Sequence, residues 1–101
     1  MINQKTLVRA TAEFIGTFVF LSVVLNTAEM GVTSPIGAGI GLMAAVFLVS
    51  KFSKAHLNPA ATFMSWFNKD TTSGDALVHV AAQLLGGVAA WWISKELNNK
   101  L

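Results

Sequence analysis

The sequence predicts an all-α integral membrane protein with three transmembrane helices and one shorter helix that enters the membrane only halfway. Hydrophobic residues make up 53% of the 101 residues and charged residues only 12%, and the mean hydropathy is +0.58. The apolar residues form blocks, whereas a soluble helical bundle, the alternative, spaces them along one face. A span needs about 20 apolar residues, so three spans and their connections fit residues 1–101 as a single domain.

The first span runs from about Ala10 to Leu25 and follows Lys5 and Arg9. Basic residues before an apolar stretch also begin a signal peptide. No small-residue cleavage site is obvious after this stretch, and two further apolar segments follow it. We therefore interpret it as a retained span.

The second span runs from about Ile36 to Phe52, after a turn at Pro35, and the third from about Ala76 to Ile93. Trp91 and Trp92 close the third span, and a lysine follows them. Tryptophan and lysine together are typical of an anchor at the membrane interface. Both segments therefore have the composition and the flanks of membrane spans.

Small residues recur at four-residue spacing in these two spans. Gly37 and Gly41 form such a pair in the second span, and Ala82, Gly86 and Ala90 form a series in the third. Small residues on one helix face let backbones approach closely, which membrane bundles need because lipid offers no hydrophobic drive for association. We expect these faces to pack against other helices, although glycine and alanine are common in spans generally.

The stretch HLNPAAT lies between the second and third spans and predicts the half-membrane helix. Residues Asn58 to Phe67 would form a helix of about 15 Å, half the hydrocarbon thickness. Asn is a preferred N-cap and Pro is favoured at the first helical position, so Asn58 and Pro59 predict a helix start. The irregular backbone before it is tolerated at membrane depth only if it is buried or lines a water-filled cavity. The alternative is a surface helix after an ordinary loop.

A helix that starts near the bilayer midplane directs about half a positive charge and free N–H groups at that point. Such a field repels cations and protons and orients neutral dipoles. Asn58 could accept a backbone hydrogen bond with its side-chain oxygen and still offer two N–H donors to water or a hydroxyl group. This chemistry favours passage of small uncharged molecules.

Glu13 and Gln83 are polar residues inside predicted spans. A carboxylate inside a membrane usually faces the protein interior and has a partner. We expect Glu13 to accept hydrogen bonds from the backbone around Lys54 to Leu57 and so to brace the loop, unless it lies close enough to the interface to reach water. Gln83 either joins this brace or makes a plain interhelical hydrogen bond.

Several function classes find no support in the sequence. Cysteine is absent, and His56 and His79 share no metal-ligand spacing with acidic residues, so we expect no metal and no other cofactor. No Ser-His-Asp set, paired carboxylates or phosphate-binding glycine loop is visible, and nothing points to nucleic acid. We do not expect an enzyme.

The string SKAHLNPAAT resembles the SGAHLNPAVT signature of the aquaporin and aquaglyceroporin family. AEFIGTFVF is similar to the first span of that family and AAQLLGG to its third, in the same order. The resemblance covers nearly the whole chain. It corresponds to the first of the two inverted repeats that such proteins ordinarily contain, and it implies one aquaporin-like repeat.

The resemblance also implies roles for individual residues. Asn58, Pro59 and Ala60 would form half of the central pore constriction, Glu13 would brace the loop, and the carbonyls from Lys54 to His56 would line one vestibule.

The resemblance implies filter positions as well. They fall on Ala38, with Val46, Ala55 and Ala61 contributed by a symmetry-related partner. All four are small or apolar, which implies a pore wide enough for glycerol-sized solutes. Lys54 stands where the family usually has glycine, so a long cation lies at or near the pore wall.

Three spans and one half-helix cannot enclose a pore, so a second half-repeat is needed. It is either an inverted copy of this chain, which we favour, or a different polypeptide. The basic residues divide five to two between the sides of the membrane: Lys5, Arg9, Lys51, Lys54 and Lys69 on the N-terminal side, Lys95 and Lys100 on the other. This asymmetry predicts a cytoplasmic N-terminus and mildly disfavours insertion in both orientations.

Two functions compete at this point. The first is a passive membrane channel for water and small uncharged solutes such as glycerol, formed by two half-repeats among membrane lipids. The second is a non-conducting membrane protein that pairs with or modulates another channel subunit.

Overall fold

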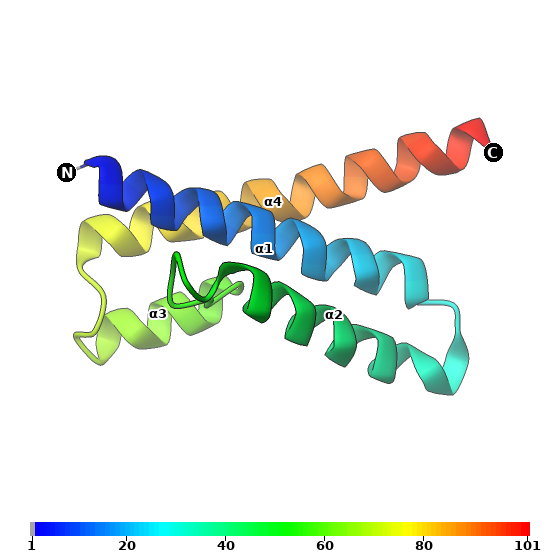
Figure 1. The fold of residues 1–101 in the computed structure, drawn as a ribbon, viewed down its shortest axis with the longest axis horizontal. Helices are drawn as coiled ribbons and strands as arrows, with labels where there is room; N and C mark the ends of the chain where they lie inside the picture. Colours follow the sequence, from blue (N-terminus) through cyan, green and yellow to red (C-terminus); the bar gives the residue numbers. More distant parts are fainter. Residues whose placement is uncertain (1) are drawn as a thin grey trace.

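The computed structural model describes residues 2–101, apart from the side chain of Val32, and this part of the chain is all-helical, with no strands. Two long helices lie side by side through the middle of the molecule, and two shorter ones pack on them (Figure 1). The termini lie at opposite ends of the longest axis. The elements are α1 (Gln4–Thr27), the 3-10 turn η1 (Gly31–Thr33), α2 (Ser34–Val49), α3 (Pro59–Phe67) and α4 (Ser73–Lys100).

Helices α1 and α4 are long and apolar enough to cross a membrane, with 24 and 28 residues. At about 1.5 Å per residue they extend over roughly 36 and 42 Å. Both continue beyond the predicted spans because polar residues add turns at each end. Asn3 caps α1 by accepting from the Thr6 N–H, and Thr72 caps α4 by accepting from the Asp75 N–H.

Helix α2 is apolar but shorter, with 16 residues. It begins at Ser34, with Pro35 in its first turn, and ends at Val49, three residues before the predicted end of the second span at Phe52. The N–H groups of Phe52 and Ser53 both donate to the Val49 carbonyl and close a turn. The apolar run in the sequence continues to Phe52, whereas helix α2 ends at Val49.

The small residues lie where the helices approach most closely. Ala82, Gly86 and Ala90 are buried along α4, and a Cβ at Gly86 would lie 2.6 Å from the Phe14 carbonyl oxygen of α1. In α2, a Cβ at Gly41 would lie 2.7 Å from the Val23 side chain of α1. These small side chains therefore let α2 and α4 approach α1, as the four-residue spacing predicted.

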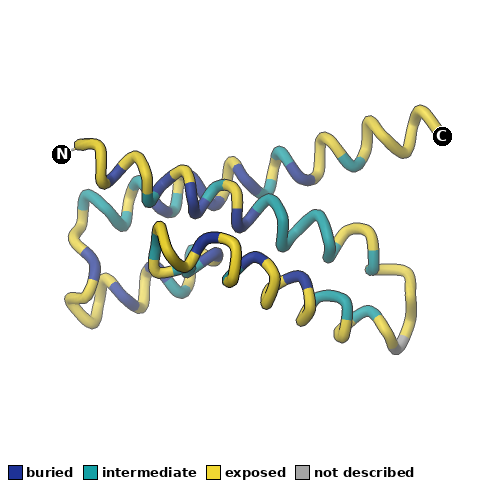
Figure 2. Tube along the Cα trace, viewed as in Figure 1, coloured by how far each residue is buried: buried dark blue, intermediate teal, exposed yellow. Residues whose placement is uncertain are grey.

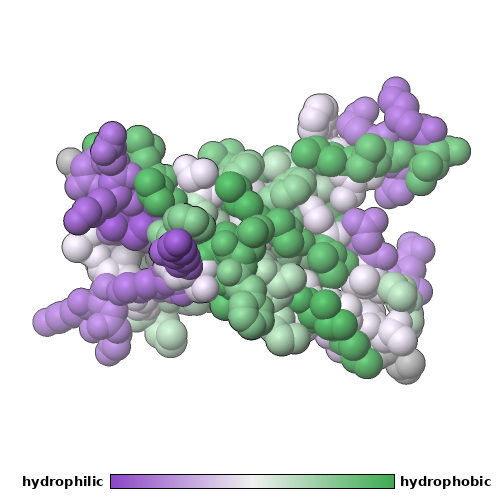
Figure 3. Space-filling model, viewed as in Figure 1, coloured by the Kyte–Doolittle hydropathy of each residue, from purple (hydrophilic) through white to green (hydrophobic). Residues whose placement is uncertain are grey.

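The interior is small and partly polar, whereas the surface is apolar. Burial is concentrated where the loop before α3 meets α1 and α4 (Figure 2). On the face shown in Figure 3, apolar side chains cover the middle of the molecule and hydrophilic ones gather toward its ends. A surface of this kind suits a bilayer, whose hydrocarbon layer lies between two polar layers. The buried polar or charged residues are Thr6, Glu13, Thr17, Thr62, Ser65, Thr71, His79 and Gln83.

The packing of α4 on α1 predicts different outcomes for two glycine substitutions. Gly86→Ala forces the backbones apart, because the added methyl group meets a carbonyl oxygen, and should cost about 1–3 kcal/mol of stability. Gly39→Ala on α2 meets no atom within 4 Å and should be nearly neutral. Melting temperatures of the purified protein in detergent compare the two. Equal melting temperatures would contradict the close packing.

Candidate functional site: the half-helix and its braced loop

Helix α3 begins in the middle of the molecule, where the irregular segment after α2 has returned the chain to α1 (Figure 1). Asn58 is extended, with φ −157° and ψ 125°, and its side-chain oxygen accepts from the Ala60 N–H at 2.8 Å. Pro59 is the first helical residue. The motif therefore starts a helix as predicted, and the nine residues of α3 extend over about 14 Å.

The carboxylate of Glu13 binds the segment that precedes α3. Its Oε2 accepts from the Ser53 hydroxyl at 2.7 Å and the His56 N–H at 3.1 Å. Its Oε1 accepts from the Leu57 N–H at 2.8 Å and the Gln83 amide at 2.9 Å. The side chain is 0% exposed, and these four donors compensate its charge without a cation. The hydrogen bonds expected from the sequence are present, including that from Gln83.

The backbone takes an uncommon shape to reach this carboxylate. Ala55 and Leu57 have φ values of 53° and 55°, in the left-handed region that residues other than glycine rarely occupy. This alternation turns two successive N–H groups toward one anion, as in a backbone nest. The Leu57 side chain is buried, and a Cβ at Gly16 would lie 2.5 Å from it. Packing and hydrogen bonds thus hold the strained segment together.

A cavity of about 670 Å³ lies on one side of this segment. Lys54 and His56 line it, together with Ala61 in the first turn of α3. Within residues 2–101, no N–H group donates to the carbonyls of residues 54–57. Lys54 and His56 line the cavity, so their carbonyls are the ones placed to accept hydrogen bonds from water or hydroxyl groups.

A second groove, of about 480 Å³, lies beside Asn58 and Pro59, between α1 and α4. It contains Thr17 and Gln83, each 2% exposed. Thr17 Oγ1 and Gln83 Oε1 are buried and lack a hydrogen-bond partner among the described residues. Such atoms usually have a partner in the assembled protein or a bound water.

A side-chain relay connects the brace to the cavity. The Gln83 amide donates to Thr62 Oγ1 at 2.8 Å, and that hydroxyl lies 2.8 Å from His56 Nδ1. The Thr62 hydroxyl can accept two hydrogen bonds and donate one, so it can accept from Gln83 and still pair with either tautomer of His56. The His79 ring centroid lies 6.0 Å from that of His56. In the described part of the chain, no cluster of three or more residues has a metal-binding arrangement.

The other predicted pore residues lie apart from these cavities. Ala38 is half-buried on α2, and Ala60 is exposed at the start of α3. Val46 and Ala55 pack against the apolar cluster of Ala12, Ala45, Val49 and Leu57. Their pore roles concern an assembled channel and stay predictions.

Two members of the network, Ser53 and Thr62, were not predicted from the sequence. Ser53 gives no signal of its own, because a hydroxyl before a loop is common. Thr62 lies inside the HLNPAAT motif, four residues after Asn58, and that relation could have identified it.

The Glu13 network predicts a large effect of a small substitution. In Glu13→Gln the new NH₂ group faces two N–H or O–H donors, and the loss should cost about 2–4 kcal/mol. Glu29→Gln, at an exposed position, is the control. Melting followed by tryptophan fluorescence should show a marked drop for Glu13→Gln alone. An unchanged midpoint would mean that the carboxylate does not hold the loop.

Comparison with known proteins places this arrangement in a family. The sequence profile of the Major intrinsic protein family matches residues 1–101. No solved structure matches the chain significantly.

Three curated relatives illustrate the similarity. The chain is 34% identical to "Glycerol uptake facilitator protein-like 6" of Lactiplantibacillus plantarum, over 78% of this chain and 38% of the relative. It is 34% identical to Aquaporin TIP1-1 of Arabidopsis thaliana, over 85% and 40%. It is 35% identical to Aquaporin-2 of Rattus norvegicus, over 85% and 34%. The chain thus spans well under half of each relative, and it belongs to the Major intrinsic protein family.

Proposed function

We propose that the protein forms a passive membrane channel for water and small uncharged solutes such as glycerol, built from two half-repeats. In this arrangement α1, α2 and α4 cross the membrane and α3 enters it halfway. The observation that carries the proposal is the start of α3, which the Glu13 network holds in the middle of the molecule with Asn58 exposed.

The chemistry of this start favours neutral solutes. The N-terminal end of α3 carries partial positive charge, which repels cations and protons. Asn58 uses its oxygen to cap the helix, and its amide N–H groups remain to donate to a water or hydroxyl oxygen. The carbonyls of Lys54 and His56, which line the larger cavity, supply acceptors on the approach. Ala61, which also lines the larger cavity, leaves room for a solute of glycerol size.

A second half-repeat would cover the groove beside Asn58. Leu84 and Val88 line that groove and are more than half exposed, and the partnerless Thr17 and Gln83 oxygens lie in it. We propose that an inverted copy of the chain docks there. A two-fold axis in the membrane plane makes such an interface self-complementary.

The inverted copy must insert against the charge asymmetry. The orientation with a cytoplasmic N-terminus has more basic residues on the cytoplasmic side and is the favoured one. The second orientation is then less populated, and the amount of dimer depends on it.

Osmotic shrinkage of liposomes tests the channel directly. Vesicles that contain the protein purified alone should shrink faster than empty vesicles. Asn58→Trp should abolish this increase in shrinkage rate because the indole blocks the start of α3. Asn99→Trp, at the exposed end of α4, should leave it unchanged. Shrinkage no faster than in empty vesicles, with correctly folded protein, would support the non-conducting interaction protein instead.

Cysteine crosslinking tests the inverted arrangement, because the chain has no cysteine of its own. Ala60→Cys should form disulfide-linked dimers, since the two starts of α3 meet near the axis. Lys69→Cys should not, because inverted copies hold this residue on opposite membrane surfaces and a disulfide needs Cα atoms within about 7 Å. Crosslinking through Lys69→Cys would indicate parallel dimers.

A further inference from the structure

The larger cavity follows one face of α3 from its first turn to its last. Ala61, Met64, Ser65 and Asn68 line it, at the three- and four-residue spacing of one helix face. The cavity therefore runs from the polar end of the molecule toward the start of α3. Lys54 and His56, from the loop before α3, also line the cavity.

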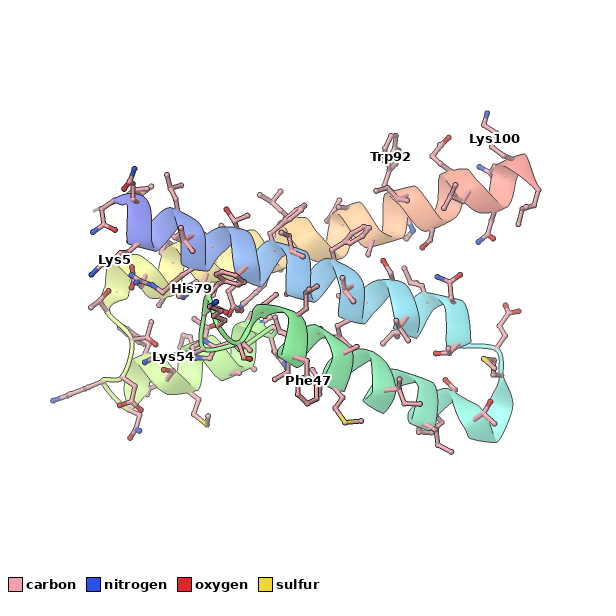
Figure 4. The ribbon with its side chains drawn as sticks, in the orientation of Figure 1. Lys5, Phe47, Lys54, His79, Trp92 and Lys100 are labelled. Carbon is pink, nitrogen blue, oxygen red and sulfur yellow. The ribbon has the colours of Figure 1, made fainter. Side chains whose placement is uncertain are left out.

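Lys54 lies across the outer part of this cavity. Its ammonium group donates to the Asp70 carbonyl oxygen at 2.6 Å, so the side chain joins the loop before α3 to the connection after α3 (Figure 4). The bond goes to the backbone and not to the Asp70 carboxylate, whose Oδ2 accepts instead from the Asn68 amide at 2.7 Å.

The charges that line the cavity cancel only because Lys54 is present. With histidine counted as neutral at pH 7, Lys54 and Asp70 are the charged residues of the lining. Arg9 is paired with Asp75 at 2.7 Å and does not line the cavity. Without Lys54 the lining would carry one negative charge, in a concave space that attracts cations.

We infer that Lys54 is a specificity-determining residue of the conducting path: its ammonium group offsets Asp70 and keeps small cations out of the cavity. This inference rests on the proposed channel. It assigns cation exclusion on the approach to a side chain, in addition to the field at the start of α3. Neutral solutes do not respond to this charge, so water passage does not depend on it.

Two measurements on the same vesicles test this role. Water permeability comes from osmotic shrinkage. Potassium permeability comes from efflux out of potassium-loaded vesicles, with a protonophore present to carry the compensating charge. Lys54→Met should raise the ratio of potassium efflux to water permeability about tenfold, which corresponds to about 1.4 kcal/mol. The increase should be larger at low ionic strength, because salt screens exposed charges.

Further variants separate charge from mechanical support. Lys54→Arg should retain cation exclusion, and Lys51→Met, at an exposed lysine outside the cavity, should have no effect. The double variant Lys54→Met with Asp70→Asn restores a neutral lining without restoring the hydrogen bond to the backbone. If the charge of Lys54 excludes potassium, this double variant should exclude potassium again. If Lys54 acts only through its hydrogen bond to the backbone, the double variant should remain permeable to potassium.

The possible results are distinguishable. If the unmodified protein passes no water, the channel itself is wrong. If the unmodified protein passes water, and Lys54→Met is no more permeable to potassium than the unmodified protein, the proposed role of Lys54 is wrong. The proposed channel is then unaffected. A double variant that stays leaky also overturns the charge role.

Discussion

The buried carboxylate of Glu13 is the interaction on which the rest of the site depends. It gathers donors from the loop before α3 and from Gln83 of α4 around one residue of α1. A carboxylate without partners would be costly in a membrane, and a loop with unsatisfied N–H groups would be costly as well. The carboxylate accepts from the N–H groups of the loop, and those groups compensate its charge. The charge and the irregular backbone can therefore both be buried.

The need for donors to reach Glu13 also explains why small residues line the helix contacts. Donors reach Glu13 only if α4 and the loop approach α1 closely, and Gly86 allows the first approach while Gly16 leaves room for Leu57. The bulky apolar side chains that would fill a soluble core lie on the outside instead. Packing and polar bonding therefore act together here, and neither would suffice alone.

Much of this arrangement could be predicted from the sequence, because its signals are local. Asn58 and Pro59 define a helix start, Glu13 and Gln83 need partners, and apolar blocks mark long helices. The end of α2 was missed because Phe52 extends the hydropathy beyond the last helical turn. The positive φ of Leu57 could not be foreseen either, since it results from tertiary contacts with Glu13 and not from the residue's own preference.

The separation of the Glu13 donors along the chain also constrains the order of biosynthesis. Ser53, His56 and Leu57 follow Glu13 by 40 to 44 residues, and Gln83 follows it by 70. Glu13 itself is made early, but the Gln83 donor belongs to α4, the last helix of the chain. The complete set of four hydrogen bonds can therefore form only after the ribosome has synthesised that helix. A ribosome stalled before Gln83 would hold a chain in which the Glu13 carboxylate lacks one of its four donors.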